Sequence, residues 1–257
     1  MPTLLDLPHE ILLWVYQSLD NITDALHLAK SCKLLSHVFD RRPQNRRKIL
    51  LSITDNTEGT ESPDKAWLED HFGPGSLWQP DESEFPPELA DAATRTFLTT
   101  VGFPVIDLRR TGYHSTHLSK AERRLEPYDS DELYGRRTPD DDSPRTDFCF
   151  HFGSVWEWMV MVDGENGEVC LYDPGGWDHG AGYQGLVAFS VDIFAMLLGM
   201  MAGVVEDLDA AMDVFGEDEG EEVRRAVLDA LRERMAEYDY CFSEGCKFWD
   251  ELFEHLL

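Results

Sequence analysis

Residues 148–172 carry the clearest β-strand pattern in the chain and limit the folds that it can adopt. Phenylalanines at every second position from Phe148 to Phe152 begin the pattern. A second alternating run follows over residues 156–162, and the Asp- and Gly-rich segment 163–167 predicts a tight turn into a returning strand. The sequence therefore predicts an antiparallel meander with one strongly aromatic face.

Helical periodicity surrounds this meander. Apolar residues recur at helical spacing over about residues 191–208, 219–238 and 246–257. An earlier helix is expected to open near Pro87 or Glu88 and to end at Gly102. Strands bracketed by helices indicate an α+β domain in which helices pack on one face of an antiparallel sheet.

The first 40 or so residues predict three short amphipathic helices in close succession. Pro8 suits the first turn of a helix, where its missing N–H costs nothing. Asn21 is a plausible cap for the second helix, and Pro43 is expected to close the third. These helices are too few and too apolar to form a sealed domain alone.

Two motifs in this segment are similar to F-box sequences: Leu-Pro-x-Glu-Ile-Leu at residues 7–12 and Cys-Lys-x-Leu at residues 32–35. The resemblance covers residues 3–50. F-box segments bind the Skp-type adaptor of cullin–RING ubiquitin ligases. The resemblance implies an adaptor-binding surface at positions Leu7, Pro8, Ile11, Leu12, Val15 and Leu19. The alternative is an N-terminal helical cap that packs on its own domain.

Charge divides the chain into two parts. The formal net charge is −28. Residues 1–55 hold seven Lys and Arg against six Asp and Glu, a balance of +1, so that −29 falls on residues 56–257. Such a field repels nucleic acids and anionic membranes and favours a basic protein partner. The apolar run 187–205 is interrupted by polar residues and glycines, so it indicates a buried helix and no membrane span.

The five cysteines are scattered and show no zinc-ligand spacing. The N-terminal residues lack the charged region and the cleavage site of a secretory signal. These features predict reduced thiols and a location in the cytoplasm, the nucleus or both.

A second resemblance covers about residues 85–257. The stretch 97–104, Phe-Leu-Thr-Thr-Val-Gly-Phe-Pro, is similar to the opening of SUKH-superfamily domains, particularly those of actinobacterial immunity proteins. The strand residues 169–172 and the terminal helix with Phe248, Trp249 and Leu252 follow in the expected order. Members are non-enzymatic binders, and bacterial ones neutralise cognate toxins. The chain departs from the family in a long acidic insert around Asp140.

These observations predict an F-box at residues 3–50, a linker and irregular segment at 51–84, and a SUKH-like α+β binding domain at 85–257. Candidate partner-binding residues in the second domain are Glu157, Trp177 and Asp178. The loop that holds Asp173, Asp178 and His179 is more typical of a structural turn than of a metal site. We therefore expect no catalytic residue, no metal and no cofactor.

The two resemblances together favour the substrate-recognition subunit of an F-box-type cullin–RING ubiquitin ligase. Its N-terminal helices would bind a Skp-type adaptor, and its acidic domain would capture a basic protein target. The alternative is a non-catalytic immunity-type inhibitor that binds a toxin nuclease or deaminase. An enzyme is the third and least favoured class.

Overall fold

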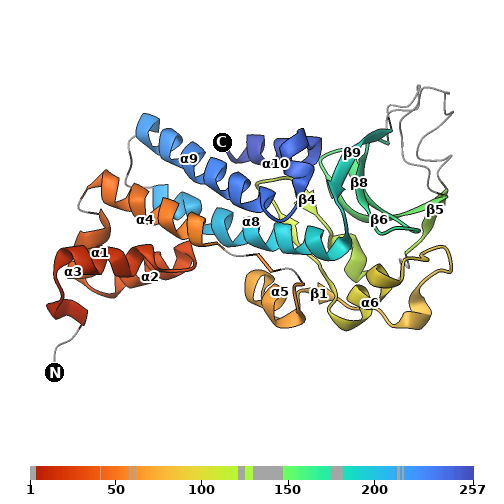
Figure 1. The fold of residues 1–257 in the computed structure, drawn as a ribbon, viewed down its shortest axis with the longest axis horizontal. Coiled ribbons are helices and arrows are strands. Elements are labelled where there is room, and N and C mark those ends of the chain that lie inside the picture. The colour runs from red at the N-terminus through yellow and green to blue at the C-terminus, as the bar shows by residue number, and fades with distance from the viewer. Residues whose placement is uncertain are drawn as a thin grey trace. The chain divides into compact units, whose positions relative to one another are not determined.

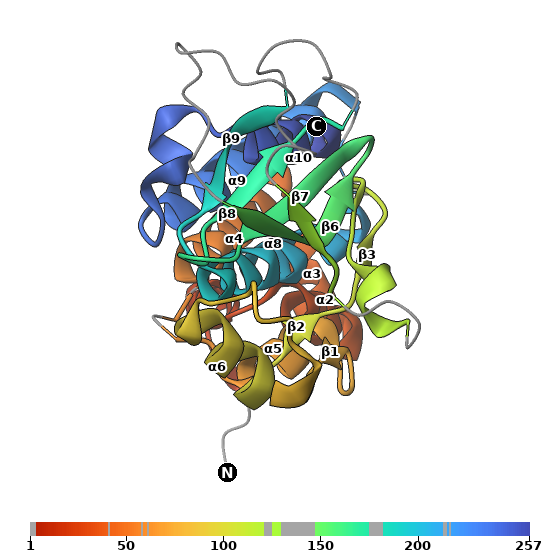
Figure 2. The same ribbon diagram turned by 90° about the vertical axis from the view of Figure 1, so that its right-hand side faces the viewer.

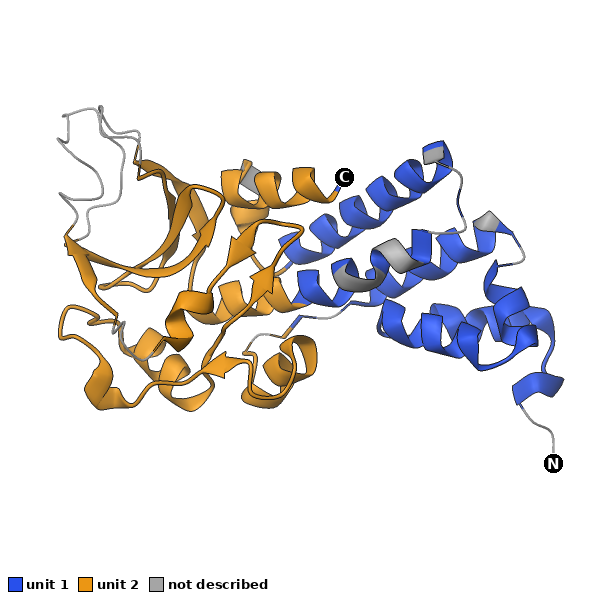
Figure 3. Cartoon of the chain, turned by 180° about the vertical axis from the view of Figure 1, so that it is seen from behind, with its two compact units in different colours: residues 1–59, 200–237, 257 blue, residues 60–199, 238–256 orange. Residues whose placement is uncertain are grey.

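The chain divides into two compact units in the computed structural model (Figure 3). Unit 1 contains residues 1–59, 200–237 and 257, and unit 2 contains residues 60–199 and 238–256. The structure describes residues 4–40, 42–57, 59–60, 62–120, 125–129, 147–174, 182–212, 215 and 217–257.

Unit 1 is built from helices. Its elements are a 3-10 turn η1 (Leu4–Asp6), α1 (His9–Gln17), α2 (Ile22–Ser31), α3 (Lys33–Asp40), α4 (Pro43–Asn56), the second part of α8 (Val191–Met212) and α9 (Glu217–Ala236). The predicted cap of α2 is confirmed, because the Asn21 side chain accepts a hydrogen bond from the Asp24 backbone N–H at 2.7 Å.

Pro43 does not close the third helix as the sequence suggested. It occupies the first turn of α4, a helix that the sequence analysis did not separate, where proline loses no hydrogen bond. α4 continues to Asn56 and α5 starts at Lys65, so both helices extend into the predicted linker and irregular segment 51–84.

The N-terminal helices share their core with a distant part of the chain. α4 packs beside α9 (Figure 1). Within the same unit, the buried Arg46 donates hydrogen bonds to the carbonyl of Ala211 and to the carboxylate of Asp40. Residues 200–237, which we expected in the second domain, therefore complete the helical unit of the first.

Unit 2 holds an antiparallel sheet, as predicted. The strands run in the order β3 (Asp107–Leu108), β4 (Tyr113–His114), β6 (Phe148–Val155), β7 (Trp158–Asp163), β8 (Val169–Tyr172) and β9 (Tyr183–Ala188). A short strand β5 (Pro127–Asp129) also pairs with β6, and β1 (Leu77–Trp78) pairs with β2 (Phe103–Pro104). The residues around Asp140, where the sequence indicated a long acidic insert, lie outside the described residues.

Helices flank this sheet. They are α5 (Lys65–Phe72), α6 (Ala92–Thr100), the first part of α8, and α10 (Lys247–Leu256), with the 3-10 turns η2 (Glu82–Glu84), η3 (Thr116–Ser119) and η4 (Tyr240–Glu244) between elements. α10 lies against β9 (Figure 2). The ring of Phe194 in α8 lies 5.9 Å from Phe103, 5.7 Å from Tyr113 and 5.6 Å from Phe248.

Both faces of the meander bury apolar side chains. Alternate residues of a strand point to opposite faces, and here Phe150 and its neighbour Cys149 are both buried. Cys149 belongs to a cluster that includes Met161, Cys170 and Tyr172. The expectation of a single aromatic face is therefore too simple.

α6 begins later than the sequence suggested. Ala90 and Asp91 donate their backbone N–H groups to the carbonyl of Gly164, at 2.7 and 2.9 Å. These bonds hold the residues before Ala92 against the predicted 163–167 turn and keep them out of the helix. The Asp91 carboxylate then caps α6 by accepting from the Thr94 N–H at 2.7 Å.

Candidate partner-binding surfaces

The hairpin between β6 and β7 turns on only two residues. Val155 pairs with Trp158, so Trp156 and Glu157 form the turn. The alternating pattern predicted a strand from residue 156 that includes both residues, and this prediction is wrong. The turn was missed because it lacks the Gly or Asn that two-residue hairpin turns usually contain.

Trp156 adopts an unfavourable backbone conformation. Its φ is +53°, and among the described residues it is the only one other than glycine with a positive φ. An L-residue in this region costs about 1–2 kcal/mol, because its Cβ crowds the following carbonyl oxygen. Bulky residues are rare there, so a tryptophan at this position requires an explanation.

The Trp156 ring rests on a glycine. A Cβ added to Gly112 would lie 2.5 Å from Cε2 of Trp156, so the indole lies directly against the Gly112 backbone. Gly112 itself has a φ of +74°. The ring of His255 in α10 lies 4.5 Å from the indole, tilted by 51°. The side chain is nevertheless 53% exposed, which is a large area for a tryptophan.

The next tryptophan along the hairpin already binds a cation from the same unit. Nζ of Lys247 lies 4.7 Å from the centroid of the Trp158 ring and also donates to the Gln184 side chain. Glu157 is exposed between the two tryptophans. This candidate residue therefore lies at the tip of a hairpin and is accessible to a partner.

The other two candidates from the sequence cannot be placed. Trp177 and Asp178 lie in segment 175–181, outside the described residues. Asp173 precedes this segment, and its backbone N–H donates to the carbonyl of Gly182 at 2.7 Å.

Unit 1 exposes an apolar surface that differs from the predicted one. Leu7 is 38% exposed and Pro8 is also exposed, whereas Leu12 is only 1% exposed and packs in the helical core. Ile11, Val15 and Leu19 are half-buried. Trp14, absent from the predicted set, is 66% exposed.

The inward face of α1 was hard to predict because the five residues from Ile11 to Val15 are all apolar. A continuous apolar run covers every direction around a helix, so its spacing does not show which residues face the core. The buried pair Leu12 and Tyr16 identifies that face in the structure.

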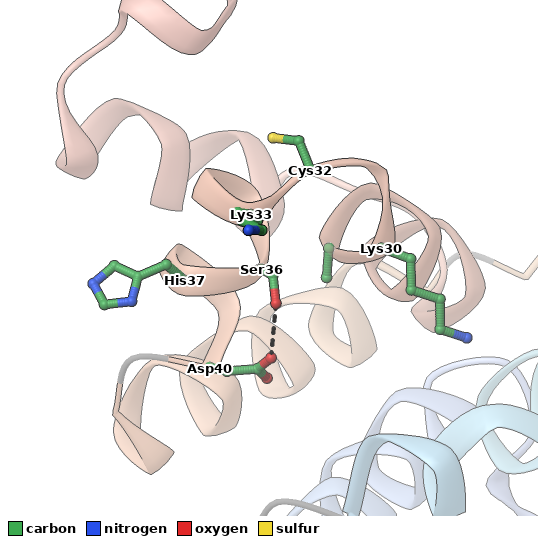
Figure 4. Close-up of a pocket in the computed structure, with 7 residues that line it drawn as sticks. Lys30, Cys32, Lys33, Ser36, His37 and Asp40 are labelled. Carbon is green, nitrogen blue, oxygen red and sulfur yellow. Dashed lines mark hydrogen bonds between the residues drawn. The ribbon is translucent and has the colours of Figure 1, made fainter.

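A shallow hollow of about 570 Å³ lies on α2 and α3 (Figure 4). Ser36 donates to the Asp40 carboxylate at 3.3 Å across it, while His37 points away from this pair. The three side chains therefore do not form a nucleophile and base arrangement. The hollow is lined by Ala29, Lys30, Cys32, Lys33, Ser36, His37 and Asp40.

Two cysteine thiols of unit 2 have raised pKa values because they are buried in its core. Burial raises the pKa of the Cys170 thiol, and it raises that of Cys246 to about 11. None of the five cysteines, all of which lie in the described part of the chain, forms a disulfide. The described part of the chain contains no group of three or more His, Cys, Asp or Glu side chains placed to hold a metal. None of its helices is both long and apolar enough to span a bilayer.

Comparison with known protein families matches residues 63–255 to the SUKH-4 immunity protein family. The match confirms the predicted SUKH resemblance and starts before the expected boundary at residue 85. The same comparison finds no F-box, so the other resemblance gains no support. No curated protein and no solved structure matches the chain.

Proposed function

This chain belongs to the SUKH-4 immunity protein family, and we propose that it is a non-catalytic inhibitor that binds a protein toxin. The family match carries the proposal, because it covers three quarters of the chain and includes the whole antiparallel sheet. This function was the alternative in the sequence analysis, and the family assignment makes it the leading one.

The charge of the chain supports a nuclease or a deaminase that acts on nucleic acid as the toxin. Proteins that bind nucleic acid contact phosphates through lysine and arginine, so they present a basic surface. A chain with a formal net charge of −28 complements such a surface and attracts it over a distance. The inhibitor would then bind where the toxin binds its substrate.

The test is an inhibition titration with the intact chain. Purified nuclease and deaminase toxin domains encoded in the source genome are assayed with increasing amounts of the protein. We expect the activity of one toxin to fall to zero at a 1:1 ratio while the toxin remains intact on a gel. Higher salt should weaken the inhibition. Inhibition of none of these toxins, or inhibition far below a 1:1 ratio, contradicts the proposal.

The exposed apolar residues of unit 1 favour a second candidate function, binding to a Skp-type adaptor of a cullin ligase. Exposed apolar patches mark interaction sites. Five of the eight exposed large apolar side chains of the described chain lie in η1, α1 and α3 or in the link between η1 and α1: Leu4, Leu5, Leu7, Trp14 and Leu34. Both candidates act in the cytoplasm or the nucleus.

Co-purification with a Skp-type adaptor separates the two candidates. The intact chain is compared with a variant that carries Leu7→Asp and Pro8→Ser. Retention by the intact chain and loss in the variant would establish adaptor binding. Leu12 is unsuitable for this test, because a polar residue at a buried position would unfold the helices. If neither the intact chain nor the variant retains the adaptor, the apolar surface does not bind it.

A further inference from the structure

We propose that Trp156 and Glu157 form a binding site for an arginine or lysine side chain of the partner protein. The inference rests on the proposed function and names the part of the surface at which the toxin docks. The cation would stack on the exposed part of the Trp156 indole and pair with the Glu157 carboxylate.

The strained backbone is the first observation. Glycine or asparagine would occupy a left-handed turn position at lower cost, yet the chain has tryptophan with φ +53°. Burial in the core does not explain this choice, because more than half of the side chain is exposed. An unfavourable residue that is also accessible indicates a role outside folding.

The second observation is that the ring is held in place before any partner arrives. The indole lies against the Gly112 backbone on one side and beside the His255 ring. A side chain that is already fixed loses little conformational entropy on binding, and exposed aromatic anchors of this kind dominate protein interfaces.

The third observation concerns charge. Trp158 shows that this hairpin binds cations, because it carries the Lys247 ammonium on its ring. Within the described part of the chain, no cation lies over Trp156 and no ion pair holds Glu157. Trp156 is therefore an exposed indole beside an exposed carboxylate, on a hairpin whose other tryptophan already contacts an ammonium group.

Neighbouring charges leave this site available. In the strand pair that contains Gly112, the exposed Arg109 lies 3.5 Å from its own partner, Asp107. In α10, His255 lies 3.8 Å from Glu251, and the adjacent Glu254 is exposed. Arginine suits the site best, since its planar group stacks on an indole and also donates to a carboxylate.

The experiment uses the intact chain with 15N-labelled tryptophan and hexa-arginine as the probe. Spectra are recorded in about 150 mM salt, where distant charges are screened. We expect a saturable shift of the Trp156 indole N–H signal, assigned by its absence in Trp156→Gly, while the Trp14 signal stays in place. Hexaglutamate should shift neither signal.

Two variants test whether the tryptophan binds or merely packs. Trp156→Gly and Trp156→Asn both suit the left-handed turn, so we expect their melting temperatures to equal or exceed that of the parent. Their affinity for hexa-arginine should fall at least tenfold, and Glu157→Gln should weaken it several-fold. Trp14→Ala, a matched loss of an exposed tryptophan, should leave affinity unchanged.

Equal affinity in the parent and Trp156→Gly would overturn the inference, and so would a marked drop in the melting temperature of both turn variants. Failure of this site is distinct from failure of the proposed function. If the chain inhibits a toxin and Trp156→Gly inhibits it equally well, the site is wrong and the function stands. If hexa-arginine binds at Trp156 and no toxin is inhibited, the cation site stands and the proposed function is wrong.

Discussion

The two units bury their apolar residues in different ways. Unit 1 consists of helices and leaves large apolar side chains such as Trp14 and Leu7 exposed on its N-terminal elements. Unit 2 encloses an aromatic core in which Phe103, Phe194 and Phe248 are 0% exposed, although Trp156 and Tyr240 stay exposed at its surface. A short helix has apolar residues on more sides than one neighbour can cover, whereas a sheet covered by helices encloses its core.

This difference predicts where substitutions act. Changes in the aromatic core of unit 2 should alter stability strongly, whereas changes of the exposed apolar residues of unit 1 should have little effect on folding. Four predictions test the comparison, in order of expected effect.

The largest loss of stability is expected for Phe194→Ala. Its ring packs edge-on or stacked against four aromatic residues of unit 2, and no neighbour can fill the space that it leaves. Urea denaturation should show a loss of about 3–5 kcal/mol. The matched change Trp14→Ala in unit 1 should cost no more than about 0.5 kcal/mol. Equal losses for the two variants would remove the contrast between the units.

Arg46→Met tests the polar core of unit 1. The buried guanidinium bonds to the carbonyl of the buried Ala211 and to Asp40, so its removal leaves that carbonyl without this donor and breaks the ion pair with Asp40. We expect a loss of about 2–3 kcal/mol. The neighbour Arg47 makes an exposed ion pair with Glu222 at 3.1 Å, and Arg47→Met should cost about 0.5 kcal/mol or less. A small effect at Arg46 would show that α4 needs no anchor to residue 211.

Alkaline pH should destabilise the chain through unit 2. Burial raises the pKa of Cys246 in the folded state from 9.0 to about 11, so the folded chain favours the neutral thiol. The stabilisation is complete below pH 9 and is lost as the pH rises towards 11, by about 2 kcal/mol. Urea midpoints measured between pH 8 and pH 11 should fall less steeply in Cys246→Ala. Cys32→Ala, at the half-buried cysteine of unit 1, serves as the matched control substitution.

The helix caps should give the smallest effects, and the two units should agree. The Asn21 side chain caps α2 in unit 1, and the Asp91 side chain caps α6 in unit 2, each by a bond of 2.7 Å to a backbone N–H. Replacement of either residue by alanine should cost about 1 kcal/mol in thermal or urea unfolding. A much larger loss at Asp91 would show that its carboxylate supports the adjoining 163–167 turn as well.

Local patterns predicted the elements of this fold well. The cap at Asn21 and the turn at 163–167 depend on residues close in sequence, and both occur in the structure. Asp163 accepts a hydrogen bond from the Glu165 N–H at 2.7 Å, and Gly167 has the expected positive φ of +76°. The last three helices also lie within a few residues of their predicted bounds.

The predictions failed where distant residues decide the outcome. Pro43 fits the end of one helix and the start of the next equally well, and the packing of α4 on α9 selects the second. The start of α6 depends on bonds to Gly164, more than 70 residues away. The hairpin turn at Trp156 was missed because the ring packing on Gly112 opposes the local preference of tryptophan.

The close approach of Gly112 and Trp156 also restricts how the sequence can change during evolution. Gly112 is constrained twice, by its φ of +74° and by the ring that lies on it. Loss of the tryptophan would remove only the second constraint, so glycine should persist at position 112 in relatives that have a small residue at 156. A relative that keeps the tryptophan but carries a side chain at position 112 must place the indole elsewhere. The pair would therefore change in one order: the ring first, the glycine afterwards.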